Sequence, residues 1–303
     1  CLTPRDLNSL FEIAQRDQLK VFPLGSGSNL LLHDWIDGIV LSSIDRSVEI
    51  EGVRVTAGAG LSWDELVQIT LASNLFGLEN LSGIPGTVGA APMQNIGAYG
   101  VELSEMIIGV EVFDLVNNET RYFDREACQF GYRTSHFKVY QAGQYFITKV
   151  ILELNRHFQP VLVYSDIARL PKTKTASGQS LRSAVLAIRA GKLPDYNNTP
   201  NAGSFFKNPF VTHKMSQDLS SQGLRTYSFD GRFKVSAAAL IQAAGLVGIR
   251  SGGVRVSPKH ALVFENVGEA TLADIQDLAA RVREAVHTQF GVQLEMEPQG
   301  YAV

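Results

Sequence analysis

GLENLSGIPGTVGAAPMQNIGAYG, residues 77–100, contains glycine at 77, 83, 86, 89, 97 and 100, whereas the whole chain of 303 residues has 27 glycines. That is about three times the glycine density of the whole chain. Strands and helices do not need so many glycines, so the stretch is a loop that turns tightly or approaches another group closely. Taken alone, it could be an ordinary turn or a ligand site.

A second glycine-rich turn comes earlier in the chain, in LGSGSNLLL at residues 24–32. It follows an expected strand and offers consecutive backbone N–H groups, a concave arrangement that binds phosphate oxygens. It is not a G-x-G-x-x-G fingerprint, because Leu30 replaces the third glycine, and the chain has no G-x-x-x-x-G-K-[ST]. Two backbone cradles far apart in sequence suit a long ligand with a central pyrophosphate, and a flavin dinucleotide is the obvious candidate.

The overall composition is that of a globular protein: 45% of the residues are hydrophobic, and 27 Lys and Arg against 30 Asp and Glu give a net charge of −3. Mild acidity without basic runs argues against nucleic acid as a partner, and no apolar run is long enough for a membrane span. Cys1 and Cys128 cannot build a disulfide framework, which fits a reducing compartment, so we take the cytoplasm as the default location. Because the chain starts with Cys1 rather than methionine, we expect a fragment.

Hydrophobic periodicity predicts an α+β chain of mixed sheets with flanking helices. Ser62 and Glu65 stand in capping-box register at the start of one predicted helix. The residues from 47 to 60 alternate as a hairpin with a turn at Glu51 and Gly52. The predicted helices are 3–17, 62–74, 236–245 and 271–291, and the further strands are 109–116, 119–123 and 145–154.

NAGSFFKNP, residues 201–209, places Ser204 between a glycine and two phenylalanines. A buried strand whose serine hydroxyl caps a backbone group would have this sequence. A nucleophile or a proton donor would look the same, so these nine residues leave the role of Ser204 open.

Seven ordered motifs resemble, at about the same spacing, those of the UDP-N-acetylenolpyruvoylglucosamine reductase family. They are PLGSGSNLLL, LSGIPGTVGAAPMQNIGAYG, GYRTSHFK, KLP, NAGSFFKNP, AGLVGIRSGGVRVSPKHALVF and FGVQLEME, between about residue 20 and residue 297. The resemblance implies two FAD-binding subdomains of the vanillyl-alcohol-oxidase type and a C-terminal α+β substrate domain. The implied divisions are 1–42, 43–194 and 195–303.

The family resemblance also implies an activity: reduction of UDP-N-acetylenolpyruvoylglucosamine to UDP-N-acetylmuramate for peptidoglycan, with NADPH and non-covalent FAD. Hydride addition to the enolpyruvyl double bond builds up an enolate, which needs fixed positive charge and then a proton. The match assigns Arg133 to the carboxylate and enolate, Glu297 to assistance there, and Ser204 to proton donation. Without the match, Arg133 reads as a surface ion pair and Glu297 as a solvated charge.

The resemblance extends to binding residues. It assigns Lys192 and His260 to phosphates, Asn208 to the nucleotide and Tyr164 to a loop over the UDP, although each could be an ordinary surface group. It implies small-molecule partners and no metal, and we expect a monomer. The implied flavin contacts are Gly25, Ser26, Gly27, Ser28, Asn29, Gly83, Ile84, Pro85, Gly86, Thr87, Gly89, Ala90, Gln94, Asn95, Gly97, Ala98, Tyr99 and Arg189.

One departure from the family pattern lies at the C-terminal end. Glu297 is followed by Pro298 and Gln299, where the family continues E-V-R, so a flavin-contacting arginine is absent and the terminal strand is expected to be altered. The GSGSN loop has neither histidine nor cysteine, so covalent flavin attachment there is not expected. Two alternatives stay open: a flavin oxidase of the same fold, and an inactive nucleotide-binding relative.

Overall fold

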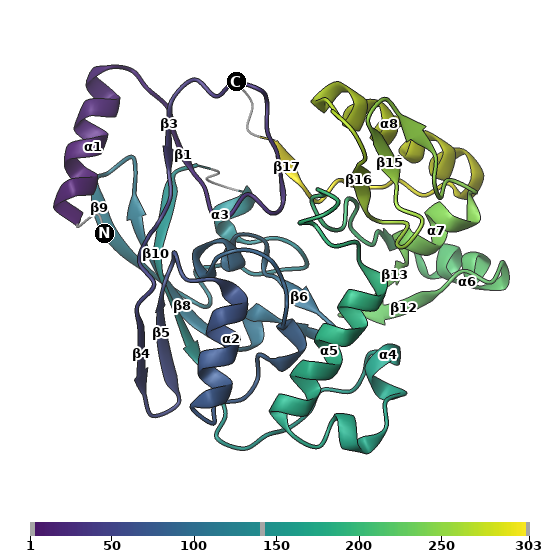
Figure 1. Cartoon of the computed structure of the whole chain (residues 1–303), viewed down its shortest axis with the longest axis horizontal. Coiled ribbons are helices and arrows are strands. Elements are labelled where there is room, and N and C mark those ends of the chain that lie inside the picture. The colour runs from purple at the N-terminus through teal and green to yellow at the C-terminus, as the bar shows by residue number, and fades with distance from the viewer. Residues whose placement is uncertain (1–3, 140–142, 301–303) are drawn as a thin grey trace. The chain divides into compact units, whose positions relative to one another are not determined.

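The computed structural model describes residues 4–139 and 143–300, and the chain divides into two compact units (Figure 1). Unit 1 runs to Gly27 and continues over Asp37–Arg189, while unit 2 comprises Ser28–Ile36 and everything from Ala190 onward. The first glycine-rich turn therefore contributes to both units. The predicted divisions at residues 42 and 194 remain predictions.

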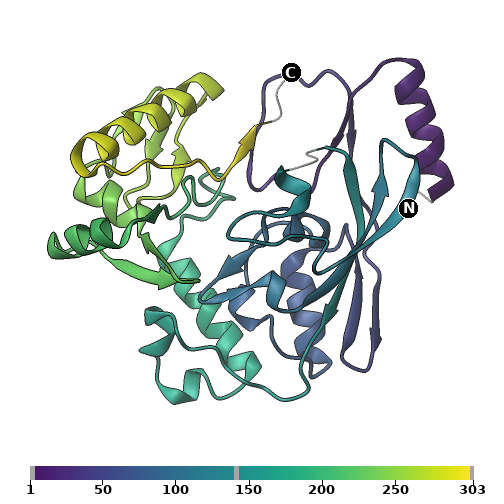
Figure 2. The same ribbon diagram turned by 180° about the vertical axis from the view of Figure 1, so that it is seen from behind.

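Unit 1 is built on an antiparallel sheet in the order β4-β5-β10-β8-β9. The two long strands β8 and β10 run side by side, as Figure 2 shows from behind. The predicted hairpin and the three further strands are confirmed, but the hairpin turn occupies Gly52 and Val53, because Glu51 still pairs with Arg54. The strands are β4 (Val48–Glu51), β5 (Arg54–Gly58), β8 (Ile107–Asp114), β9 (Glu119–Asp124) and β10 (Tyr145–Glu153).

The two predicted N-terminal helices are confirmed as α1 (Pro4–Arg16) and α2 (Trp63–Ala72). Helix α1 packs on the sheet through Phe11. Its ring stacks on the ring of Phe113, and the two ring centroids are 5.4 Å apart. Cys1 and Thr3, the first residue of the predicted helix, lie outside the described residues.

The predicted capping box of α2 is wrong. The Ser62 side chain makes no capping hydrogen bond, and its backbone instead forms a bridge with Thr87 of the glycine-rich loop. The Glu65 carboxylate pairs with Arg46 at 2.5 Å. A tertiary contact at each position therefore replaces the local one that the sequence pattern indicated.

The glycine-rich stretch 77–100 folds against the end of the sheet rather than as one open loop. Val88 N–H donates to Leu61 O at 2.8 Å, and Gly89 N–H donates to Ala59 O at 2.9 Å, so the stretch is fixed to the segment between β5 and α2. It contains η1 (Glu79–Leu81), η2 (Val88–Gln94) and β6 (Gly97–Ala98), which pairs with β7 (Val101–Glu102).

The remaining elements of unit 1 are short, apart from α5, whose last residues belong to unit 2. Strands β1 and β3 pair in parallel beside the first glycine turn. The elements are β1 (Val21–Pro23), β3 (Ile39–Leu41), η3 (Leu103–Glu105), α3 (His136–Val139), α4 (Ser165–Ala168), η4 (Lys172–Lys174) and α5 (Gly178–Lys192).

Unit 2 holds two three-stranded sheets and three helices around its own core, in which Phe205, Phe206 and Phe264 meet. The sheet strands are β11 (Phe210–Val211), β12 (Thr226–Phe229), β13 (Arg232–Val235), β14 (Arg250–Ser251), β15 (Val254–Val256) and β16 (Phe264–Asn266). The helices are α6 (His213–Ser221), α7 (Ala237–Ala243) and α8 (Leu272–Phe290).

The boundaries predicted for two helices of unit 2 are confirmed. Ser236 caps α7 by accepting from Ala239 N–H, Thr271 and Asp274 form a capping box on α8, and Gly291 ends α8 in the left-handed conformation with φ +67°. These local signals agree with the tertiary packing, so the prediction of an α+β chain of mixed sheets with flanking helices is confirmed.

Candidate active site

The two glycine-rich segments meet inside unit 1. A Cβ atom built on Gly25 would come within 3.0 Å of both Ala90 Cβ and Thr87 Oγ1. A side chain at position 25 would crowd both neighbours, so the two segments approach each other closely, as a backbone cradle for a pyrophosphate requires. The residues present therefore fit an FAD site in unit 1. Of the first turn, Ser26 lies in the same unit, whereas the predicted contacts Ser28 and Asn29 belong to unit 2.

A charged clamp holds the second glycine-rich segment. Gly83 N–H donates to Asp64 Oδ1 at 2.7 Å, and the Arg182 guanidinium of α5 grips both oxygens of the same carboxylate at 2.6 and 2.7 Å. The hydrogen bond from Arg182 lowers the pKa of Asp64 below its ordinary value. The clamp joins α2, α5 and the glycine-rich segment, and none of its charged residues was predicted from the sequence.

Arg189 and Tyr99, two predicted flavin contacts, lie together beside Gly83. A Cβ on Gly83 would be 3.3 Å from both Cδ and Nε of Arg189. Burial raises the pKa of Tyr99 above its ordinary value, although the Arg189 charge opposes this. The ring of Tyr164, the predicted substrate residue, packs edge-on against Tyr99 with centroids 5.3 Å apart. The structure thus brings these three predicted residues together.

Arg133 belongs to a two-residue turn between Gly131 and Thr134, which exchange backbone hydrogen bonds of 3.1 and 3.3 Å. Its φ of +56° is uncommon for a residue with a side chain and persists only where the surroundings impose it. Arg133 Nη2 donates to Gly97 O at 2.7 Å, so its guanidinium lies against the glycine-rich segment. The predicted catalytic arginine and the predicted flavin contact Gly97 are therefore neighbours.

Ser204 and Glu297 lie on adjacent segments of unit 2. Ser204 bridges to Val263 on one side, and Glu297 N–H donates to Phe205 O at 2.9 Å on the other. The Glu297 side chain is buried. No residue in the described ranges forms a hydrogen bond with the Ser204 hydroxyl, so the capping role considered for it from the sequence finds no support.

The departure after Glu297 does not abolish the terminal strand. Residues Gln299–Gly300 form β17, which pairs in parallel with β2 (Leu30–Leu31). Gln299 N–H also donates to Asn29 O of the first glycine turn at 3.2 Å. Gln299 thus supports the turn through its backbone, which any residue except proline would do.

His260 and Lys192, the predicted phosphate contacts, are close enough to influence each other. Burial lowers the pKa of His260, and the positive charge of Lys192 lowers it further. His260 Nδ1 accepts from Leu262 N–H at 3.3 Å. A histidine in this setting is neutral at pH 7, so Lys192 supplies the permanent positive charge here.

Asn208 lies in a polar group that the sequence did not indicate. Its Nδ2 donates to the Tyr227 hydroxyl at 2.6 Å, and its Oδ1 accepts from Ala237 N–H at 2.9 Å. Lys234, opposite Tyr227 in the hairpin, is 3% exposed, and its ammonium lies 3.3 Å from the centroid of the Phe229 ring. The aromatic rings of the hairpin thus surround the Lys234 ammonium next to Asn208. The sequence TYSFDGRFKV, residues 226–235, shows that aromatic residues and a lysine lie near each other in the chain. Only the strand register shows which of them face each other.

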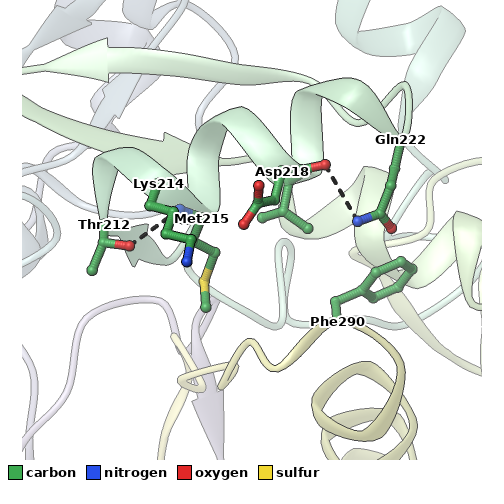
Figure 3. Close-up of a pocket in the computed structure, with 7 residues that line it drawn as sticks. Thr212, Lys214, Met215, Asp218, Gln222 and Phe290 are labelled. Atoms are coloured by element: carbon green, nitrogen blue, oxygen red, sulfur yellow. Dashed lines mark hydrogen bonds between the residues drawn. The ribbon is translucent and has the colours of Figure 1, made fainter.

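An open pocket of about 380 Å³ lies elsewhere on unit 2, beside α6 and the end of α8 (Figure 3). Its polar side chains bind their own helix: Thr212 Oγ1 accepts from Met215 N–H, and Gln222 Nε2 donates to Asp218 O. None of the predicted site residues lines it. This pocket is therefore separate from the candidate site.

Over residues 4–139 and 143–300, no His, Cys, Asp and Glu side chains gather in a group of three that could hold a metal ion. In the same part of the chain, no helix combines the length and the apolar character that crossing a bilayer demands.

Comparison with known proteins gives a consistent family match. Residues 1–120 match the FAD binding domain, and residues 194–301 match the C-terminal domain of UDP-N-acetylenolpyruvoylglucosamine reductase. The reductases of that name from Bdellovibrio bacteriovorus and Pseudomonas aeruginosa are 43% and 41% identical over 98% of this chain, covering 91% and 90% of those proteins. The crystal structure of the Thermus caldophilus enzyme superposes with a TM-score of 0.70 at 26% identity, covering 99% of this chain and 90% of that one.

The paired glycine-rich segments and the matched FAD binding domain define a flavoprotein oxidoreductase. Its FAD-binding fold carries a C-terminal α+β domain, as the resemblance implied. The chain belongs to the UDP-N-acetylenolpyruvoylglucosamine reductase family.

Proposed function

We propose that this chain reduces the enolpyruvyl double bond of UDP-N-acetylenolpyruvoylglucosamine to give UDP-N-acetylmuramate, with FAD as its cofactor and NADPH as the reductant. The observation that carries the proposal is the Arg133 guanidinium, fixed to Gly97 of the glycine-rich segment by a hydrogen bond of 2.7 Å. It places a permanent positive charge beside the predicted flavin site, where an acidic unsaturated substrate needs one. Family membership supplies the substrate class.

FAD, when bound, supplies the hydride that the substrate double bond receives. The backbone of the Gly25 turn, with Thr87 and Ala90, would hold its pyrophosphate, and Arg189, next to Gly83 and Tyr99, would contact the cofactor elsewhere. These residues bind and orient the cofactor and keep water from the reacting atoms.

Arg133 would bind the substrate carboxylate and stabilise the charge that develops next to it. Its planar guanidinium presents five donors in a fixed fork, and one nitrogen already donates to Gly97 O. This anchoring aligns the group before the reaction, so no reorganisation is required when the enolate forms. Preorganised charge of this kind is usually the largest single contribution to catalysis.

Ser204 would give its proton to the enolate carbon. Its hydroxyl has no hydrogen-bond partner among the residues that the structure describes, so no protein contact competes for that proton. Buried Glu297, on the neighbouring segment, would assist at the enolate. Solvent then restores the proton to the serine, which completes the balance of one hydride and one proton added to the double bond.

The UDP part of the substrate would be held mainly by unit 2. Lys192 offers a charge to the phosphates, and Asn208 adds a polar contact next to buried Lys234. His260, neutral at pH 7, would donate or accept a hydrogen bond there. Tyr164, packed on Tyr99, would cover the nucleotide.

We also propose the domain division, the oligomeric state and the cellular location of the enzyme. The division into residues 1–42, 43–194 and 195–303, a monomeric state and a cytoplasmic location fit an enzyme that uses soluble nucleotide substrates. Size-exclusion chromatography with light scattering tests the monomer.

The first test mixes the purified flavoprotein with NADPH and UDP-N-acetylenolpyruvoylglucosamine and follows pyridine nucleotide absorbance. We expect oxidation that depends on the UDP-sugar. Rapid oxidation in air without it would indicate the oxidase alternative, and ligand binding without turnover would indicate the inactive relative.

The second test uses Ser204→Ala in stopped-flow absorbance. Flavin reduction by NADPH is expected to stay within twofold, while reoxidation by the enolpyruvyl substrate slows at least 100-fold, since general acid catalysis contributes about 10²–10⁴. Unchanged reoxidation would remove Ser204 from the mechanism.

A further inference from the structure

Asn95 occupies an unusual place between the glycine-rich segment and the Arg133 turn. Its backbone is left-handed, with φ +46° and ψ +69°, and its side chain is fully buried. It stands at the end of η2, two residues before Gly97, whose carbonyl accepts the hydrogen bond from Arg133. The family resemblance implies a flavin contact for Asn95, which stays a prediction, and the hydrogen bonds of its side chain lie within unit 1.

The side-chain amide of Asn95 is bonded on both ends. Oδ1 accepts from Ser104 N–H at 2.8 Å, while Nδ2 faces Gly131 O at 3.1 Å, Glu102 Oε2 at 3.0 Å and Ser104 Oγ at 3.2 Å. A donor is required on the second side, because two of those three atoms only accept hydrogen bonds. Asparagine also tolerates the left-handed backbone that this position demands.

We propose that Asn95 is the positioning residue for Arg133, which rests on the catalytic role proposed above for that arginine. The bond to Gly131 O fixes the start of the Gly131–Thr134 turn, and the Arg133–Gly97 bond fixes the guanidinium. Both anchors lie on one continuous segment, residues 95–97. Residues 95–97, which border the proposed flavin site, therefore also position the Arg133 guanidinium that would stabilise the enolate.

Two neighbouring contacts support this reading. Ser135 Oγ donates to Met93 O at 2.7 Å, and Lys138 Nζ donates to Gln94 Oε1 at 3.3 Å. Together with Asn95, they join residues 93–95 to residues 131–138 in successive steps. The strained φ of Arg133 is held by this set of bonds, as expected for a backbone outlier that its surroundings impose.

Loss of the Asn95 amide should slow reoxidation of the flavin by the substrate but not reduction of the flavin by NADPH. Without the amide of Asn95, the turn loses its link to the glycine-rich segment, and the guanidinium shifts relative to the substrate carboxylate. A displacement of about 1 Å at a positioned group can cost about 10²-fold in rate. Reduction of the flavin by NADPH does not require the enolate grip and should change little.

The test variant is Asn95→Ser, measured in stopped-flow experiments on the holoprotein. Reoxidation by UDP-N-acetylenolpyruvoylglucosamine should slow about 10- to 100-fold, with flavin reduction by NADPH within twofold. Asn118→Ser is the matched control, because Asn118 also has a left-handed backbone, with φ +54°, but lies in the β8–β9 turn. Equal slowing of both half-reactions, or the same loss in the control, would indicate a merely structural role and overturn the proposal.

A double-mutant cycle shows whether Asn95 acts through Arg133 or independently of it. In the Arg133→Met background, Asn95→Ser should slow reoxidation by less than twofold, because its effect acts through the arginine. Additive losses would contradict the proposal.

Calorimetric titration supplies a readout that does not depend on turnover. Asn95→Ser should weaken binding of UDP-N-acetylmuramate, which carries the carboxylate, by about 10-fold. It should leave UDP-N-acetylglucosamine, which lacks the carboxylate, within twofold. Equal loss for both ligands would refute the carboxylate grip.

Ser135→Ala keeps the inference testable if Asn95→Ser does not fold. It removes one neighbouring bond and should slow reoxidation selectively, by about threefold to tenfold. An unchanged rate would count against the proposal. Failure of the wild-type protein to reduce the UDP-sugar would instead refute the proposed function, so the two failures are distinguishable.

Discussion

Arg182→Met should destabilise unit 1 by about 2–3 kcal/mol. The guanidinium is 7% exposed and grips Asp64 with two hydrogen bonds, and its removal leaves a carboxylate that is only 28% exposed without its cation. Breaking a fully buried pair costs about 3–5 kcal/mol, and the remaining exposure of Asp64 lowers that figure. The bond from Gly83 N–H to Asp64 persists, so the glycine-rich segment loosens without being released.

The assay is urea unfolding of the variant and the wild type, followed by circular dichroism, with the midpoint and slope fitted together. Glu65→Gln is the matched control. It lies next to Asp64 on the same helix and pairs with Arg46, but these side chains are 41% and 63% exposed. An exposed pair contributes about 0–1 kcal/mol. Equal losses in both variants would refute the idea that burial makes the clamp strong.

The contribution of the clamp should also depend on pH in a definite direction. The pKa of Asp64 in the folded protein lies below its ordinary value of 3.8, so the folded state favours the charged carboxylate. The stability is fully present above that ordinary value and is lost as the pH falls through the lowered pKa. The difference between wild type and Asp64→Asn should be constant from about pH 5 to pH 8 and shrink below about pH 4. A difference that grows on acidification would contradict the assignment.

Three further outcomes are expected. Gly25→Val should weaken FAD binding at least 10-fold by fluorescence titration, because the added atoms would overlap Ala90 and Thr87; affinity equal to wild type would exclude this cradle. Burial raises the pKa of the Cys128 thiol to about 12, so about one thiol in 10⁴ is ionised at pH 8. Cys128 should therefore resist iodoacetamide at pH 8 until the protein is unfolded. Rapid labelling of the folded protein, measured by peptide mass spectrometry, would contradict its burial. Thr271→Ala should cost about 1 kcal/mol in urea unfolding by removing the α8 cap, and a loss below about 0.3 kcal/mol would show that packing alone sets the helix start.

Local signals predicted the elements of the fold well where tertiary contacts agree with them. The helix starts at Ser236 and Thr271 and the hairpin of β4 and β5 follow from patterns within a few residues, and the structure contains each of them. The capping box at Ser62 failed because a distant segment takes its backbone and Arg46 takes the partner carboxylate. No short window of sequence contains that information.

In the candidate site too, some features could be predicted from the sequence and others could not. Two glycine-rich stretches together favoured two backbone cradles over ordinary turns, and the close approach of Gly25 to Ala90 supports that interpretation. Arg133 and Ser204 were assigned only by family resemblance, because one arginine or serine in sequence has many ordinary roles. The Asp64–Arg182 clamp joins residues 118 positions apart, so sequence patterns could not reveal it.

The most direct measurement is an anaerobic incubation of the FAD-loaded protein with NADPH and UDP-N-acetylenolpyruvoylglucosamine, analysed by mass spectrometry. We expect the UDP-sugar to gain two hydrogen atoms as one NADPH is consumed per product molecule. A UDP-sugar of unchanged mass, with NADPH consumed only after air is admitted, would contradict the proposed reaction.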